Sequence, residues 1–296
     1  MNTVSAIQRP TPIIDTHSHL QFHAFKSDAE NVIQKTLAQN IWMINVGTKY
    51  QTSQSAVVMA EKYKEGVYAD IGLHPMYAAA EFIKLKHDAN EEEDFVLENN
   101  FDKEKYKQLA TSKKVVAIGE IGLDYYYKPK TAEKLQQFKE KQKQVFLQQL
   151  DLAEELNLPV ILHCRMAHQD ILDILNSKRN KFGSGHKNQN AKLRGVVHCF
   201  TGTTEEMKRY VDMGFYIGIN GIIFKFDIDQ VIKEISLDNI LVETDCPYLT
   251  PPMAESKRNE PLFIKHTIQK IAELKGVSFQ EVADITTQNA KKLFKI

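Results

Sequence analysis

Eight short apolar segments alternate with longer amphipathic segments along the 296 residues of the chain. The apolar segments, which predict β-strands, are 13–16, 41–47, 67–72, 115–119, 159–163, 195–199, 215–219 and 240–244. Helices are predicted between them at 28–39, 51–64, 103–112, 133–157, 167–178, 204–213 and 228–235. This alternation is typical of a parallel sheet whose two faces are both covered by helices.

The number of strands and the chain length together predict an α/β fold of the (β/α)8, or TIM barrel, type. An open doubly wound sheet is the alternative, but no glycine-rich phosphate loop follows the first strand. Two extra C-terminal helices are predicted at 260–275 and 279–294, and Ser278 with Glu281 forms a capping box before the second. No linker, internal repeat or low-complexity tract interrupts residues 1–296, which we interpret as a single domain.

The charge balance and the cysteine pattern limit the functional classes. The chain has 38 basic and 38 acidic residues, so no strong overall field attracts it to nucleic acid, and such a partner must bind at a local site. No apolar run approaches the length of a membrane span, and the first residues do not resemble a signal peptide. Three cysteines without a CxxC pair favour a reducing environment, so we expect a cytoplasmic protein with no membrane association and no obligate protein partner.

The first predicted strand runs into two histidines in the stretch IIDTHSHL, residues 13–20. Because residues i and i+2 of a strand point to the same side, His17 and His19 can reach one metal ion. The alternative is a polar turn with two surface histidines, and the motif alone does not decide between them.

Metal-ligating residue types also end or follow other predicted strands. These residues are His17 and His19, then His74 in GLHP, Glu120 in IGEIGLDY, His163 in ILHCR, His198 in VVHCF and Asp245 in VETDCP. In a barrel, the C-terminal ends of the strands converge on the face where active sites are built. We therefore expect these side chains to lie together.

Imidazole and carboxylate ligands favour Zn²⁺, Mn²⁺ or Fe²⁺ over Mg²⁺. A ligand set with one central carboxylate suits two ions held roughly 3.5–4 Å apart, which together activate water for hydrolysis. The expected cofactor is therefore a pair of divalent ions, with Mg²⁺, Mn²⁺ and Zn²⁺ all admitted.

Eight stretches together carry a resemblance to a known family. They are DTHSHL, GLHP, IGEIGLDYY, LPVILHCR, HCFTG, YIGINGIIFK, ILVETDCPYLTP and KRNEP. From about Ile13 to Phe294 the chain resembles the TatD-like deoxyribonucleases, within the wider amidohydrolase barrels. The resemblance implies a distorted TIM barrel that binds two divalent metals and hydrolyses DNA phosphodiesters, often from the 3′ end of single strands.

The resemblance also implies a ligand set, in which His17, His19 and Asp245 hold one metal, His163 and His198 hold the other, and Glu120 bridges them. Asp245 has the character of a general base, and Glu120 and His74 complete the predicted catalytic residues. Glu243 lies two residues before Asp245 and either orients a ligand or is a barrel-interior carboxylate paired with Lys or Arg.

Cationic and aromatic residues near the strand ends are candidates for substrate binding. The predicted phosphate contacts are His74, Arg165, Lys225 and Arg258, with ordinary loop charge as the alternative. Tyr125 and Tyr126 either stack on bases or pack under their loop. Cys164, Cys199 and Cys246 each follow a proposed ligand by one residue, so strand alternation predicts that they face away from the metals.

Two long charged segments and three departures from the family pattern bear on substrate preference. The acidic segment 78–102 carries Glu91, Glu92, Glu93, Asp94, Glu98 and Asp102, and it should lie on the C-terminal face of the barrel. The basic segment 177–194 carries Lys178, Arg179, Lys181, Lys187, Lys192 and Arg194, and it should lie on the opposite face. Both are interpreted as solvated loops. The family pattern is broken by MAES before KRNEP, by Met166 where relatives carry an acidic residue, and by the length of the acidic segment.

The resulting hypothesis is a divalent-metal-dependent deoxyribonuclease, a 3′-5′ exonuclease that releases 5′-mononucleotides from single-stranded DNA ends. The first alternative is a hydrolase that uses the same metals on an ester or amide, for example an aminoacyl-tRNA ester. The second is a barrel that serves only as a binding or scaffold module, but the complete ligand set argues against it.

Overall fold

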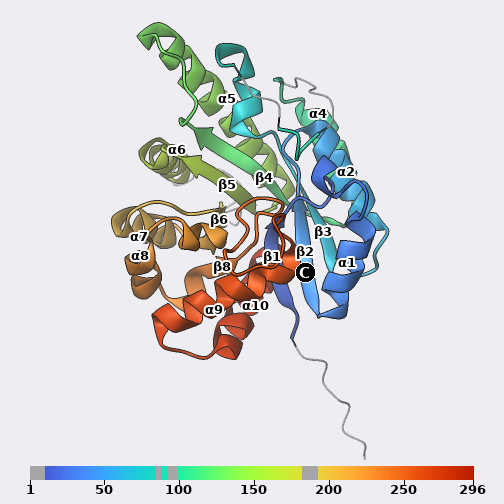
Figure 1. The fold of residues 1–296 in the computed structure, drawn as a ribbon. Coiled ribbons are helices and arrows are strands. Elements are labelled where there is room, and N and C mark those ends of the chain that lie inside the picture. The colour runs from blue at the N-terminus through green and yellow to red at the C-terminus, as the bar shows by residue number, and fades with distance from the viewer. Residues whose placement is uncertain (1–10, 85–87, 93–98, 182–192) are drawn as a thin grey trace, which may run out of the picture.

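The computed structural model describes residues 11–84, 88–92, 99–181 and 193–296, and in them eight parallel strands form one sheet in sequence order (Figure 1). The strands are β1 Ile13–Ser18, β2 Ile41–Val46, β3 Val67–Ile71, β4 Val115–Asp124, β5 Val160–Arg165, β6 Gly195–Val197, β7 Phe215–Ile219 and β8 Ile240–Val242. The first and last strands meet through a parallel bridge between Ser18 and Cys246, and the Asp245 N–H donates to the His17 carbonyl at 2.8 Å. The sheet thus nearly closes into a barrel, and the predicted TIM barrel is confirmed.

Helices surround the sheet close to the positions that the periodicity predicts. They are α1 Ala29–Ala38, α2 Tyr50–Glu61, α4 Lys103–Leu109, α5 Ala132–Leu156, α6 His168–Lys181, α7 Thr204–Asp212, α8 Asp229–Glu234, α9 Ile264–Lys275 and α10 Phe279–Phe294. A short helix that was not predicted, α3 Pro75–Ala78, follows β3, and short 3-10 turns occur at His23–Phe25, Ala80–Phe82, Gly221–Phe224, Leu237–Asn239 and Pro261–Phe263. None of these described helices is long and apolar enough to cross a membrane.

The strand β4 is five residues longer than predicted. It pairs with β5 from Ile118 to Asp124, with a register shift between Gly119 and Ile121. Gly122 allows this pairing, because its φ is +140° and a Cβ there would lie 2.1 Å from the His163 carbonyl oxygen. Glu120 therefore lies inside the strand, and the residues after it continue toward the C-terminal face.

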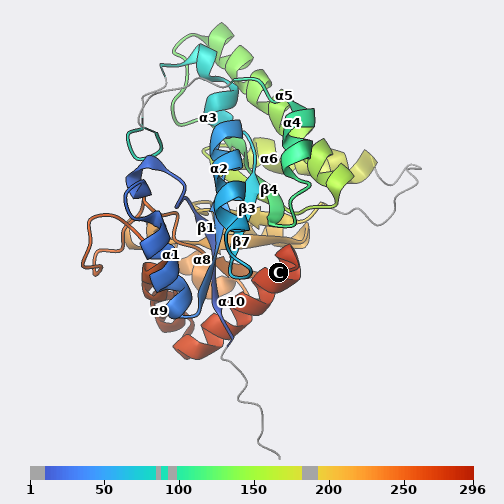
Figure 2. The same ribbon diagram turned by 90° about the vertical axis from the view of Figure 1, so that its right-hand side faces the viewer.

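The helix α10 closes the end of the barrel opposite the C-terminal face of the strands (Figure 2). Its residues Ala290, Leu293 and Phe294 pack against the apolar side chains inside the barrel. The helix begins where Ser278 Oγ accepts the Glu281 N–H at 3.1 Å, which is the N-cap half of the predicted capping box. A site inside this barrel can open only at the C-terminal ends of the strands.

Candidate metal centre

Glu120 lies between two pairs of histidines at the C-terminal face. Its Oε2 atom lies 3.6 Å from His17 Nε2 and 4.0 Å from His19 Nε2. Its Oε1 atom lies 2.9 Å from His163 Nδ1 and 3.8 Å from His198 Nε2. Each carboxylate oxygen therefore faces one histidine pair, which is the geometry that a bridging ligand requires.

Asp245 approaches the same centre from the loop after β8. Its Oδ1 atom lies 3.5 Å from His19 Nε2, 3.8 Å from His17 Nε2 and 4.0 Å from His198 Nε2. The backbone of Asp245 has a φ of +59°, an uncommon conformation for a residue other than glycine. The structure thus brings all six residues of the predicted ligand set together, with Asp245 nearest to the His17 and His19 pair.

The carboxylate of Glu120 stays ionised although it is buried. Burial by itself raises the pKa of Glu120, but the imidazoles of His74, His163 and His17 outweigh this effect and hold the pKa well below its ordinary value. The pKa of Asp245 is also lowered, because His19 and His198 oppose the effect of burial. Both carboxylates are therefore in the charged form that binds a cation.

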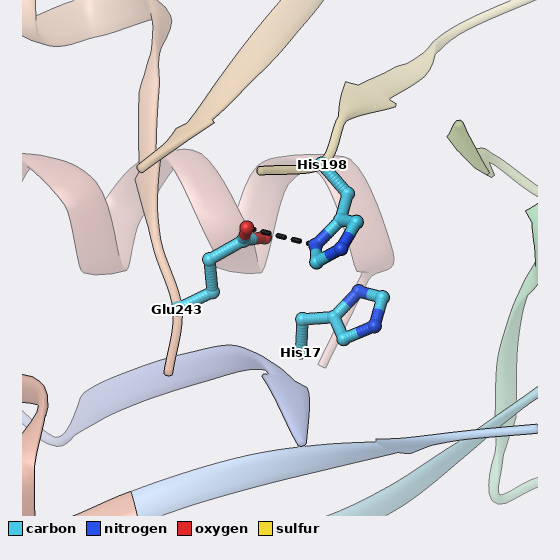
Figure 3. A group of neighbouring side chains, drawn as sticks. All are labelled: His17, His198 and Glu243. Carbon is cyan, nitrogen blue, oxygen red and sulfur yellow. Dashed lines mark ion pairs between the residues drawn. The ribbon is translucent and has the colours of Figure 1, made fainter. Parts of the chain in front are cut away.

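Contacts on the outer side of two imidazoles orient their Nε2 atoms toward the centre. His19 Nδ1 lies 2.8 Å from the Val46 carbonyl oxygen, which can only accept, so Nδ1 carries the proton and Nε2 offers a lone pair. His198 Nδ1 lies 2.8 Å from Glu243 Oε1. Figure 3 shows the two side chains pointing toward one another. Such outer contacts set the tautomer of metal-binding histidines.

The buried Glu243 is held by several groups besides His198. Its Oε1 atom accepts the Cys199 N–H at 2.8 Å and the Asn220 side-chain amide at 3.1 Å. Within the part of the chain that the structure describes, no Lys or Arg pairs with Glu243. Of the two interpretations from sequence, the geometry favours the residue that orients a histidine.

Asp124 makes the corresponding contact on the other side of the centre and was not identified from the sequence. Its Oδ2 atom lies 3.0 Å from His163 Nε2, while His163 Nδ1 faces Glu120. The sequence did contain a signal for Asp124. In a strand that continues to residue 124, Asp124 points to the same side as Gly122, and Gly122 is paired with His163 of β5. The prediction ended the strand at residue 119 and so missed it.

His74 presents an N–H group to the centre. Its Nδ1 atom accepts the Met76 N–H at 3.1 Å, so the proton of the neutral ring is on Nε2, which lies 3.5 Å from Glu120 Oε1. Burial and the neighbouring His163 lower the pKa of His74 to about 4, which keeps the ring neutral. This N–H suits a contact with a phosphate oxygen.

The other three predicted phosphate contacts lie in different surroundings. Arg165 is exposed, and its guanidinium lies 3.6 Å above the ring of Tyr126. Lys225 is exposed after the 3-10 turn that follows β7. Arg258 instead pairs with Asp28 at 2.7 Å and with Glu260 at 2.8 Å, so its charge is already balanced within the protein.

The two tyrosines after Glu120 have different environments. Tyr125 is buried, and its hydroxyl donates to Asp170 Oδ2 at 2.8 Å, so it packs under its loop. Tyr126 is 49% exposed and remains accessible to a base.

The prediction that all three cysteines face away from the metals is wrong for Cys199. Its Sγ atom lies within 4.8 Å of the ligand atoms of His198 and Asp245. Strand alternation does not apply there, because β6 ends at Val197 and Cys199 has a φ of +46°. Cys164 contacts His168 Nδ1 at 3.1 Å, and Cys246 is fully buried.

The prediction of a solvated acidic loop holds for Asp102, which is exposed at the start of α4, but not for Glu91 and Glu92. Glu91 accepts hydrogen bonds from Thr48 and, at 2.6 Å, from the Tyr77 hydroxyl, and Glu92 pairs with Lys49. These contacts lie at the C-terminal ends of β2 and β3, on the predicted face of the barrel. Glu93, Asp94 and Glu98 lie outside the described residues.

The basic segment begins as helix, because α6 continues to Lys181. Lys178 pairs with Asp151 and with Glu154, the latter at 2.8 Å, in the last turns of α5. The chain enters β5 directly after these turns, so Lys178 lies toward the face opposite the metal centre, as predicted. Lys187 and Lys192 lie outside the described residues.

Comparison with known proteins identifies the family. A sequence model of the family described as TatD related DNase matches residues 14–295. The chain belongs to this family. It is 39% identical over 289 residues to an uncharacterized metal-dependent hydrolase of Bacillus subtilis, covering 96% of this chain and 99% of the relative. A TatD-family assignment agrees with the histidine and carboxylate centre.

Other relatives of this TatD-family protein have more specific names. The protein named 3′-5′ ssDNA/RNA exonuclease TatD from Pectobacterium atrosepticum is 32% identical over 293 residues, which cover 96% of this chain and all of the relative. The crystal structure of a TatD homologue from Escherichia coli K12 aligns with a TM-score of 0.75 and 28% identity, covering 96% of this chain and 98% of the other. The chain is therefore a metal-dependent hydrolase with a TatD-type barrel.

Proposed function

We propose that this TatD-family protein is a two-metal exonuclease that shortens single-stranded DNA from the 3′ end and releases 5′-mononucleotides. The observation that carries the proposal is the position of Glu120, whose two carboxylate oxygens each face one histidine pair. In this proposal His17, His19 and Asp245 hold one ion and His163 and His198 hold the other. The names of the TatD exonuclease relatives support the substrate class.

The donor set fits divalent ions. His17 and His19 direct their Nε2 atoms to within 3.1 Å of each other, and the buried His17 Nδ1 has no hydrogen-bond partner among the residues that the structure describes. Two ring nitrogens at this separation, beside two ionised carboxylates, suit a cation between them better than a direct hydrogen bond. When bound, two such ions stabilise the charge that develops on the attacking and leaving oxygens of a phosphodiester.

Each protein group has a proposed task in the reaction. The Asp245 carboxylate accepts a proton from the attacking water, and its lowered pKa keeps it ionised for this role. The Nε2–H of His74 donates to a non-bridging phosphate oxygen, and Arg165 and Lys225 bind the phosphates of the strand. We assign no phosphate to Arg258, because Asp28 and Glu260 already neutralise it.

The test is a time course on single-stranded oligonucleotides labelled at either the 5′ or the 3′ end, with Mg²⁺, Mn²⁺ or Zn²⁺ added separately. We expect a 5′-labelled ladder that shortens by single nucleotides and 5′-mononucleotides as the small product. The variant Glu120→Gln should lose the activity, and Asp28→Asn, which removes a surface carboxylate outside the centre, should keep it. Internal cuts or 3′-mononucleotides would reject the exonuclease, and hydrolysis of esters or amides alone would favour the alternative substrate class.

A further inference from the structure

Large apolar side chains that remain exposed are concentrated around the mouth of the barrel. Among the described residues seven are exposed, and five of them follow the C-terminal ends of strands: Tyr126, Tyr127, Met166, Phe226 and Met253. The other two, Val58 and Leu147, lie on the outer helices α2 and α5. Exposed apolar side chains that gather on one face of a protein mark a binding surface, whereas single scattered ones need no explanation.

The tyrosines of this group form a cluster with basic residues at the ends of β4 and β5. The rings of Tyr126 and Tyr127 lie 4.8 Å apart in an edge-on arrangement, and Arg165 lies 3.6 Å above the first ring and 5.8 Å from the second. Lys128 and Lys130 follow in the same loop and are exposed. We refer to Tyr126, Tyr127, Lys128, Lys130 and Arg165 as the β4–β5 ledge.

The β4–β5 ledge is joined directly to the metal centre. Asp124 Oδ1 accepts the Tyr126 N–H at 2.9 Å, while Asp124 Oδ2 contacts His163 Nε2 at 3.0 Å. Arg165 is two residues after His163 on β5. A strand whose terminal phosphodiester lies at the centre would therefore reach the ledge with its next nucleotides.

Carboxylates also lie at the mouth of the barrel, beside the ends of β2, β3 and β8. The Asp88 carboxylate accepts the Tyr248 hydroxyl at 2.7 Å, and Glu91 and Glu92 are held against Thr48 and Lys49. Tyr248 follows β8, which lies across the barrel from the ledge in the strand order, whereas Tyr77, the second partner of Glu91, follows β3 next to β4. The exposed Lys128, Lys130 and Arg165 of the ledge attract a polyanion toward the ends of β4 and β5.

We infer that the β4–β5 ledge binds the nucleotides next to the scissile one, with bases stacked on Tyr126 and Tyr127 and phosphates on Lys128, Lys130 and Arg165. Exposed aromatic rings interspersed with cations are the means by which proteins bind single strands without sequence preference. This inference rests on the proposed nuclease function and adds the surface that recognises a polynucleotide as distinct from a mononucleotide ester.

The experiment compares a short oligothymidylate with a thymidine dinucleotide, which is too short to occupy the ledge. We expect Tyr127→Ala to raise KM for the oligonucleotide about tenfold, the loss of one stacked base, with kcat and the dinucleotide kinetics unchanged. Lys128→Ala should lower the slope of log KM against log salt concentration by about 0.7, one phosphate contact on a single strand. The control variants Val58→Ala and Leu147→Ala remove exposed apolar groups elsewhere and should change neither value.

The outcomes separate the ledge from the proposed function. If the wild type cleaves the oligonucleotide and Tyr127→Ala cleaves it with the same KM, the binding role of the ledge is overturned and the nuclease function stands. If the wild type does not cleave, fluorescence anisotropy with the labelled oligonucleotide decides. Binding that Tyr127→Ala weakens and Leu147→Ala does not would support the ledge without the exonuclease, and absence of binding by the wild type would overturn both.

Discussion

The replacement Glu243→Gln should weaken one of the two metal sites selectively. Glu243 is fully buried and makes its ionic contact with His198, 2.8 Å from Nδ1, while no contact between Glu243 and His163 is found among the described residues. Glutamine keeps the shape and one acceptor oxygen for the Cys199 and Asn220 donors but loses the charge. The substitution therefore removes mainly the support of one ligand.

The size of the effect follows from the type of contact. Loss of a carboxylate that orients a metal-binding histidine lowers metal affinity by about 10- to 100-fold, or ~1.4 to ~2.7 kcal/mol. We expect this loss for the ion that His198 holds and a smaller one for the ion beside His17 and His19. Asp124→Asn should act in the same way through His163, because Asp124 Oδ2 lies 3.0 Å from its Nε2.

Competition with a chromophoric chelator, followed by elemental analysis, measures both affinities. Glu243→Gln should release the ion that His198 holds at a lower chelator concentration than the wild type does, by about 10- to 100-fold, and the other ion at nearly the wild-type concentration. Asp28→Asn is the control, because its carboxylate pairs with Arg258 and not with a ligand. If a Glu243→Gln protein with a native circular dichroism spectrum binds both ions as tightly as the wild type, Glu243 does not have the assigned role of orienting His198.

Four further predictions test the rest of the site. Glu120→Ala should lose most of both metals and nearly all activity, because it faces both histidine pairs; full occupancy by elemental analysis would contradict a bridging role. Arg258→Ala should lower the melting temperature and leave oligonucleotide KM nearly unchanged, because its partners are Asp28 and Glu260; steady-state kinetics with thermal unfolding separate these effects. Cys199→Ser should alter metal affinity, measured by the same chelator competition, because its sulfur lies within 4.8 Å of His198 and Asp245 ligand atoms. Burial raises the pKa of Asp15 from 3.8 to about 7, so this group stabilises the fold below pH 3.8 and loses that contribution as pH rises through about 7. Denaturant titrations of the metal-free protein should show the free energy of unfolding fall over this pH range, and the same titrations of Asp15→Asn should not.

The periodicity of the chain determined the barrel and most of its elements. Strand β7 and helix α10 have the predicted bounds, because alternation and capping residues act over a few neighbouring positions. Convergence of the six predicted ligands also follows from local information, since parallel strands in sequence order bring their C-terminal ends to one face.

Tertiary structure decided the features that depend on a partner far along the chain. The pairing of β4 with β5 extends β4 to Asp124, and it requires a glycine at position 122 because a Cβ there would meet the His163 carbonyl. Arg258 is neutralised by Asp28, which is 230 residues away in the sequence. Glu91, which composition places in a solvated loop, bonds to Thr48 across 43 residues.

These differences have one physical cause. A strand or helix pattern is set by steric preferences and burial within a short segment, so it is visible in the spacing of residues. Whether a charged side chain meets solvent, a counter-ion or a substrate depends on which distant groups the fold brings within hydrogen-bonding distance, and spacing does not contain that information. The same limit explains Cys199, whose orientation changed when β6 ended two residues earlier than alternation required.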